Sequence, residues 1–159
     1  MQANAIQDFY PDDFSHCFGC GKLNAAGHRI KTRWEGDETV THFTPEPEHI
    51  ALPGFVYGGL VASLIDCHAM ATAAGYAVRA AGHAVGEIPS PRYVTAALNV
   101  SYLRPTPLGP VIEVRARVRE ATPRKTVVDV TVAVEGVKTA TGEVVAVPMP
   151  ETMLRKPAE

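Results

Sequence analysis

The stretch 57-YGGLVASLIDCHAMATAAGYAVRA-80 decides the fold. It contains no proline, and apolar residues such as Leu60 and Leu64 recur in it at helical spacing. Alanine is abundant, so much of the surface of such a helix carries only small side chains. A helix of this kind suits burial on most sides. We therefore predict one long helix over residues 58–80, wrapped by a sheet.

Strand patterns lie on both sides of this helix. Two short strands precede it, with expected ranges of 29–34 and 39–43 and a turn at 35–37. Four runs that are β-branched or alternate apolar and polar residues follow it, at 92–105, 111–121, 126–134 and 144–147, with a turn expected at 140–143. The predicted class is α+β, in which an antiparallel sheet surrounds one central helix.

Length and composition favour one domain without a nucleic-acid or membrane partner. The 159 residues are 46% hydrophobic and 20% charged, with a net charge of −2. No apolar run reaches the roughly 18 residues of a bilayer span. The acidic N-terminus does not resemble a secretory signal, and three cysteines form no disulfide framework. We therefore expect a reducing, cytoplasmic location.

The chain divides into three segments by pattern. Residues 1–28 form a polar lead-in and a turn-rich CxxC segment, residues 29–148 form the domain, and residues 149–159 form a C-terminal tail.

One carboxylate, Asp66, lies within the apolar helix, seven residues after the second of two glycines, Gly58 and Gly59. Glycines at a helix N-terminus leave amide N–H groups free, which suits binding of a developing oxyanion. Burial raises the pKa of a carboxylate toward the range of a general base. No lysine follows the glycines, which excludes a nucleotide P-loop. A purely structural Asp66, accepting hydrogen bonds from a loop, stays open as an alternative.

Gly58 and Asp66 are eight residues apart, or about 12 Å along a helix. A general base must reach its substrate directly or through one water molecule. One helix therefore does not present both groups to one carbonyl, whereas two antiparallel copies can. The spacing predicts a site shared between the two chains of a symmetric dimer.

These motifs resemble those of the hotdog-fold acyl-CoA thioesterases, in particular the PaaI-like branch. The resemblance runs from about residue 49 to residue 147 and is carried by 58-GGLVASLID-66, 95-TAALNVSYLRPTPLG-109 and 140-ATGEVVAV-147. It implies a hotdog fold, with an antiparallel sheet wrapped around one long central helix. It also implies a homodimer or a dimer of dimers that hydrolyses an acyl-CoA or acyl-carrier thioester without a metal or other cofactor.

The resemblance assigns roles to three residues. Gly58 would supply the backbone N–H of the oxyanion hole, Asp66 would be the general base or the nucleophile, and Thr95 would hold the attacking water. A hydroxyl can hold water but needs a base to activate it. Taken alone, Thr95 also fits an ordinary strand residue.

Two departures from the family pattern concern substrate binding. Many relatives carry a histidine where this chain has Tyr57, and some carry an asparagine or glutamine near Ala51. His49 lies two residues before Ala51 and is a candidate substitute, although a surface histidine is the simpler interpretation. We expect Tyr57, Gly59 and His49 to contact the substrate.

Several basic residues in the C-terminal half could meet the phosphates of coenzyme A. Arg104 and Arg124 lie at expected strand ends, where a loop can reach a ligand, and are the candidates for this role. The alternating arginines between residues 115 and 119 fit the solvated face of a strand better.

The pair 17-CFGC-20 lacks a second CxxC to complete a zinc site, even if His16 or His28 took part. It does not follow a strand in a βαβ unit, which argues against redox use. We predict a structural turn, with Cys67 as a core residue and His68 as a helix residue whose hydrogen bonds are satisfied.

Two alternative functions remain open. A hotdog hydratase would add water to an enoyl thioester, but neither a histidine before the glycines nor a Gly-Asp-x-Asn-Pro segment is present. A binding module would hold an acyl-CoA without releasing free thiol.

Overall fold

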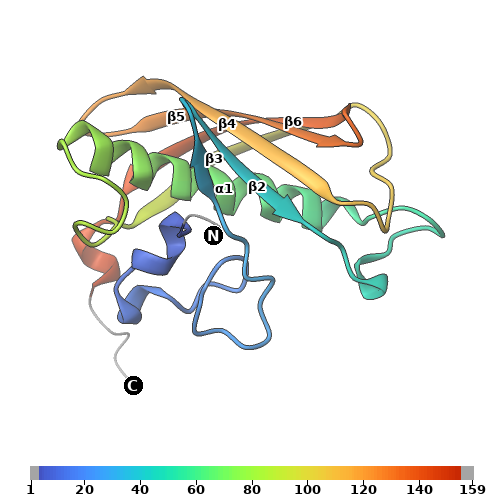
Figure 1. Cartoon of the computed structure of the whole chain (residues 1–159), viewed down its shortest axis with the longest axis horizontal. Helices are drawn as coiled ribbons and strands as arrows, with labels where there is room; N and C mark the ends of the chain where they lie inside the picture. Colours follow the sequence, from blue (N-terminus) through green and yellow to red (C-terminus); the bar gives the residue numbers. More distant parts are fainter. Residues whose placement is uncertain (1–3, 155–159) are drawn as a thin grey trace.

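A computed structural model describes residues 4–154 of the chain, and Figure 1 shows one sheet lying over one long helix, α1 (Gly58–Ala80). The strands are β1 (Arg33–Glu35), β2 (Glu38–Phe43), β3 (Tyr93–Tyr102), β4 (Ile112–Ala121), β5 (Thr126–Val134) and β6 (Val137–Pro148). Every pairing is antiparallel, in the order β1-β2-β4-β5-β6-β3. The predicted α+β class and hotdog fold are confirmed.

Burial of α1 follows its composition. The side chains of Leu60, Leu64 and Ile65 are fully buried against the sheet. By length and hydropathy alone α1 could cross a membrane, but 72% of its most apolar window is buried inside the fold. Such burial is the usual state of a helix that is apolar on most sides and lies in a protein core.

The N-terminal segment packs on the side of α1 away from the sheet (Figure 1). Short 3₁₀ helices η1 (Ile6–Phe9) and η2 (Asp12–Phe14) begin it, and Ile6 and Tyr10 belong to the main core. The Ile6 amide donates to the Thr32 carbonyl at 2.9 Å. The described part of the expected lead-in thus packs on the helix and completes its cover. The first three residues of the lead-in lie outside the described part.

Two strand predictions need correction. The first strand begins at Arg33 rather than Arg29, because residues 29–32 run along the CxxC turn, where the Ile30 amide donates to the Gly19 carbonyl at 3.0 Å. The turn expected at 140–143 lies inside β6. A Cβ on Gly142 would come 2.5 Å from Ile65 Cγ2, so this glycine allows close packing of sheet on helix.

The turn between β5 and β6 is Glu135–Gly136, with φ angles of 50° and 79°. Two successive residues with positive φ are typical of a tight hairpin turn. After β6, η4 (Glu151–Met153) forms part of the expected tail, and residues 155–159 of that tail lie outside the described residues.

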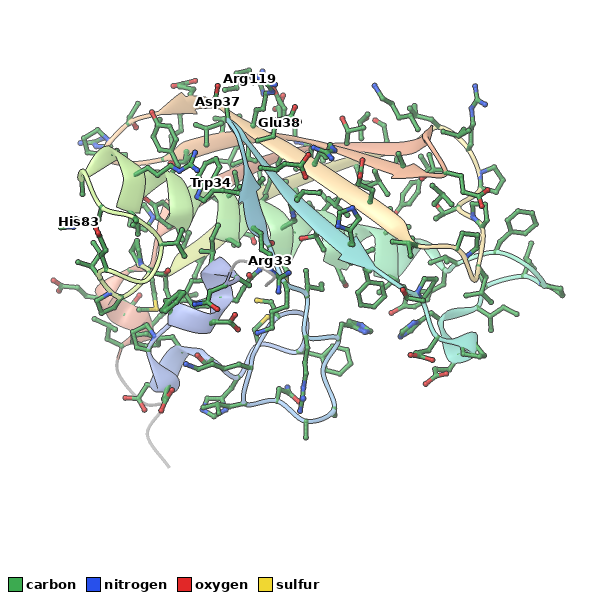
Figure 2. All side chains as sticks on the ribbon, viewed as in Figure 1. Arg33, Trp34, Asp37, Glu38, His83 and Arg119 are labelled. Atoms are coloured by element: carbon green, nitrogen blue, oxygen red, sulfur yellow. The ribbon has the colours of Figure 1, made fainter. Side chains whose placement is uncertain are left out.

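The outer face of the sheet carries the alternating arginines. Arg117 Nε donates to Glu38 Oε1 at 2.7 Å, and Arg119 Nε lies 3.2 Å from Asp129 Oδ2. Glu38 and Arg119 both lie on this outer side in Figure 2. These pairs favour the solvated-face interpretation over phosphate binding.

His68 is a fully buried residue of α1 surrounded by hydroxyl groups. Thr41 Oγ1 lies 2.7 Å from its Nδ1, and Thr39 Oγ1 lies 3.0 Å from its Nε2. Burial lowers the pKa of His68 to about 3, so the imidazole stays neutral in the folded protein. This confirms that His68 is a satisfied core residue.

Because of buried His68, the free energy of unfolding should fall as pH drops below 6.5. The unfolded chain binds a proton at His68 near pH 6.5 and the folded chain binds it only near 3, so acid favours unfolding. From pH 7 to 5 the wild type should lose about 2 kcal/mol more than His68→Asn in urea unfolding. His83→Asn makes the same substitution at an exposed site and is the control for replacing a histidine as such. Equal pH slopes in wild type and His68→Asn would contradict this assignment.

Candidate functional site

Asp66 and Thr95 meet between α1 and β3. Asp66 is half-buried on the third turn of the helix, and Thr95 is the exposed third residue of the strand. The Thr95 hydroxyl donates a hydrogen bond to Asp66 Oδ1 at 2.5 Å. Burial raises the pKa of the Asp66 carboxyl, and the Thr95 hydrogen bond partly opposes this shift. In such a pair the hydroxyl can hold a water molecule and the carboxylate, with its raised pKa, can remove a proton from it.

A small hollow of about 160 Å³ opens at this pair. Its lining includes Asp66, Thr95, Arg92 and Met70, together with the three cysteines of the chain. The Arg92 guanidinium lies over the Tyr10 ring, 4.4 Å from its centroid. The carboxylate thus lies at a recess whose lining contains both polar and apolar side chains.

Gly58 begins α1 after Tyr57, which provides no side-chain cap. Among residues 4–154, the amides of Gly58 and Gly59 have no hydrogen-bond acceptor. The Tyr102 hydroxyl donates to the Gly58 carbonyl at 2.7 Å and holds this end of the helix against β3. Free amides at a helix N-terminus are suited to an anionic oxygen.

A second hollow, of about 360 Å³, surrounds this N-terminus. Gly58 and Tyr102 line it together with Arg104, one of the two predicted phosphate-binding arginines. None of its lining residues lines the hollow at Asp66. Because α1 is continuous between the two positions, one chain does not bring Gly58 and Asp66 together.

The other predicted site residues lie in separate places. The Tyr57 ring covers Gly59, where a Cβ would come 2.6 Å from Tyr57 Cε2. His49 ends η3 (Pro47–His49) and lies in a third hollow with His28 and Phe43, and its Nδ1 accepts from the Glu46 amide at 2.8 Å.

Arg124 is exposed in the turn between β4 and β5. Thr126 pairs with Ala146, which pairs with Thr95, so this turn lies at the Thr95 end of the sheet. Arg104 and Arg124 therefore lie at opposite ends of the sheet.

Three features of the site have no signal in the sequence. Arg92 reads only as the start of a strand, and the bond from Tyr102 to Gly58 depends on long-range packing. The approach of Cys67 to the CxxC turn was also missed, since Cys17 and Cys67 are 50 residues apart.

A family model and a solved structure that match this chain both belong to the thioesterase superfamily. A family model described as Thioesterase superfamily matches residues 53–141. The crystal structure of a thioesterase superfamily protein from Shewanella loihica PV-4 is 43% identical, with a TM-score of 0.67, over 87% of this chain and 98% of that one. No curated protein sequence gives a match.

Two more distant structures share the fold. The E. coli PaaI protein of the phenylacetic acid degradation operon is 16% identical, with a TM-score of 0.62, over 77% of this chain and 81% of that one. A Streptococcus mutans UA159 protein, solved with acetyl CoA bound, is 18% identical, with a TM-score of 0.59, over 76% and 88%.

Proposed function

Because this chain belongs to the thioesterase superfamily, we propose that it hydrolyses an acyl-CoA-type thioester to a free acid and a thiol. The observation that carries this proposal is the half-buried Asp66 with the Thr95 hydroxyl bonded to it, beside a hollow at the edge of the sheet. The acetyl CoA bound to the Streptococcus mutans protein supports coenzyme A as the thiol carrier.

The proposed reaction begins with water held by Thr95. Asp66 removes a proton as the water oxygen bonds to the thioester carbon, and the carbonyl oxygen gains negative charge. The Gly58 N–H stabilises that charge. When the intermediate collapses, the carbon–sulfur bond breaks, and the thiolate leaves and is protonated. Direct attack by the Asp66 carboxylate is the alternative first step.

The free edge of β3 supports a shared site. Within the described residues no strand pairs with this edge, yet Leu98, Tyr102 and Leu103 expose 37%, 54% and 53% of their surface there. An unpaired edge with apolar side chains favours pairing with another chain. We propose a homodimer, or a dimer of dimers, built on this edge.

Antiparallel pairing of two β3 strands about their centre completes the catalytic group. It places Tyr93 of one copy opposite Tyr102 of the other, and therefore brings Thr95 and Asp66 toward the partner's Gly58 end. The same pairing brings one copy's Arg124 end toward the other's Arg104 end. These two arginines then serve the coenzyme A phosphates, while Tyr57, Gly59 and His49 contact the remaining substrate.

A panel of acyl-CoA substrates with a thiol-trapping dye tests the activity. The proposal predicts release of free thiol from at least one of them, at a rate set by enzyme concentration. Tight binding without thiol release would instead identify a binding module, and water addition to an enoyl thioester would identify a hydratase.

Mixing two inactive variants tests the shared site. Asp66→Asn and Gly58→Pro each remove one half of every site in a homodimer. After random exchange of subunits, half of the dimers are mixed and each has one intact site, so about a quarter of wild-type turnover should return. No recovery, with exchange verified by mass spectrometry, would overturn the proposal that Asp66 and Gly58 of different subunits form one site.

Removing the Thr95 hydroxyl should slow hydrolysis while leaving the fold intact. Thr95→Val keeps the shape but loses the bond to Asp66, and we expect kcat to fall about 10- to 100-fold, as for loss of a hydrogen bond to a charged group. Thr95→Ser retains the hydroxyl and should stay within a few-fold of wild type. Equal kcat for the valine and serine variants would remove Thr95 from the mechanism.

A further inference from the structure

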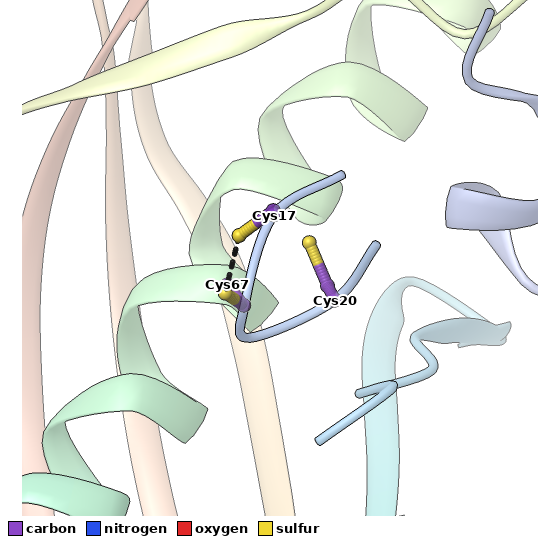
Figure 3. Close-up of side chains that lie close together, drawn as sticks. All are labelled: Cys17, Cys20 and Cys67. Atoms are coloured by element: carbon purple, nitrogen blue, oxygen red, sulfur yellow. Dashed lines mark hydrogen bonds between the residues drawn. The ribbon is translucent and has the colours of Figure 1, made fainter. Parts of the chain in front are cut away.

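The three cysteines of the chain lie in one cluster (Figure 3). Their Sγ atoms all lie within 4.8 Å of one another, and those of Cys17 and Cys67 are 3.9 Å apart. All three are free thiols; Cys20 and Cys67 are buried and Cys17 is half-buried. Two come from the loop before β1 and the third from α1, so the tertiary fold assembles the cluster.

The loop is shaped to bring its sulfurs to the helix. The Gly21 amide donates to the Cys17 carbonyl at 2.8 Å, which closes a turn and places Cys20 beside Cys17. A Cβ on Gly19 would come 2.3 Å from Cys67 Sγ, so glycine is needed for this approach. The cluster is thus held by a backbone turn and by close packing of the loop on α1.

We propose that Cys17, Cys20 and Cys67 bind a thiophilic metal ion, Zn²⁺ or Cu⁺, through three thiolates. With metal–sulfur bonds of about 2.3 Å, sulfurs in a tetrahedral or trigonal arrangement lie about 3.8 to 4.0 Å apart. The Cys17–Cys67 separation already meets this range, and the others need to shorten by about 1 Å at most. Thiolate ligands select these ions over Mg²⁺ and Ca²⁺.

A positive charge lies beside the cluster, since Arg92 lines the same hollow as the three cysteines. Arg92 adds positive charge that acts on Cys17 and Cys20, and its Nη1 is buried with no hydrogen-bond partner among residues 4–154. One Zn²⁺ with three thiolates carries a net charge of −1, which Arg92 offsets.

The structure brings three cysteine sulfurs together, whereas the sequence alone offered only the two of the CxxC pair. Neither histidine beside the CxxC pair is needed: His28 packs its ring against Phe18 and His49 instead. Cys67 supplies the third sulfur, and zinc sites with three protein ligands keep a fourth position for water or a small ligand. The cluster lines the same hollow as Asp66, but no step of the proposed hydrolysis uses the ion.

Metal binding to the full chain, reduced and metal-free under anaerobic conditions, tests the proposal without any activity assay. Zn²⁺ is measured in competition with a chromophoric chelator and by Co²⁺ substitution, and Cu⁺ in competition with a copper(I) chelator. We expect one ion per chain, thiolate-to-cobalt charge-transfer absorption, and about three sulfurs per metal by X-ray absorption spectroscopy. The two competitions decide which ion binds more tightly.

Single variants locate the site. Cys67→Ser should weaken binding by about 100-fold or more, because it removes one of three ligands. His28→Asn should bind as wild type does. Circular dichroism of each variant checks the fold, and the sulfur count of the wild type does not depend on any variant. Less than one ion per chain, a first shell without sulfur, or unchanged affinity in Cys67→Ser would each overturn the proposal.

Discussion

Replacing Asp66 by asparagine is expected to lower kcat for a good acyl-CoA substrate by about 10³-fold, or about 4 kcal/mol of transition-state stabilisation. Asparagine matches aspartate in shape and can still accept the Thr95 hydrogen bond, so the fold and the hollow should persist. It lacks the carboxylate that removes a proton from water. Some hydrolysis should remain, because the amide donors at the helix N-terminus are unchanged.

The measurement is steady-state thiol release at saturating substrate, with circular dichroism and thermal unfolding as checks of the fold. Asp129→Asn is the matched control, since Asp129 pairs with Arg119 on the outer face of the sheet. It makes the same chemical change and should leave kcat within a few-fold of wild type. Normal turnover by Asp66→Asn would show that this carboxylate is neither base nor nucleophile.

The sequence predicted the parts of the fold that depend on local pattern. Helix α1 matches its expected range, because apolar spacing and small side chains act within one segment. The turn expected at residues 140–143 was wrong because glycine occurs both in turns and where two elements pack closely. Only the position of Ile65 shows that Gly142 allows close packing. The placement of β3 beside β6 is a long-range pairing that local pattern does not determine.

For the candidate site, too, the sequence predicts some features and the tertiary structure is needed for others. The sequence itself singled out Asp66, and the resemblance to a family added Thr95. The structure adds the hydrogen bond that joins them. The spacing of Gly58 and Asp66 along one helix predicts a site shared between two chains, and in the structure the two residues line separate hollows. The cysteine cluster was missed, because its third sulfur comes from a distant element.

Deleting the Gly58 amide proton is expected to lower kcat about 10²- to 10³-fold, as for the loss of one oxyanion donor. Gly58→Pro makes this deletion with little cost to the helix, because Gly58 is the first helical residue, where proline is favoured. Tyr57 precedes it with φ −69° and ψ 143°, a conformation that proline tolerates in its neighbour.

Gly58→Ala separates the loss of the N–H from the added bulk. A Cβ at this position meets Tyr102 Oη at 3.3 Å, a close contact that alanine and proline both introduce. Alanine keeps the N–H, so it should retain most of the wild-type kcat, whereas proline should not. If both variants lose activity equally, crowding against Tyr102 is the cause. If both keep it, another group stabilises the oxyanion, and Gly58 is not part of the shared site.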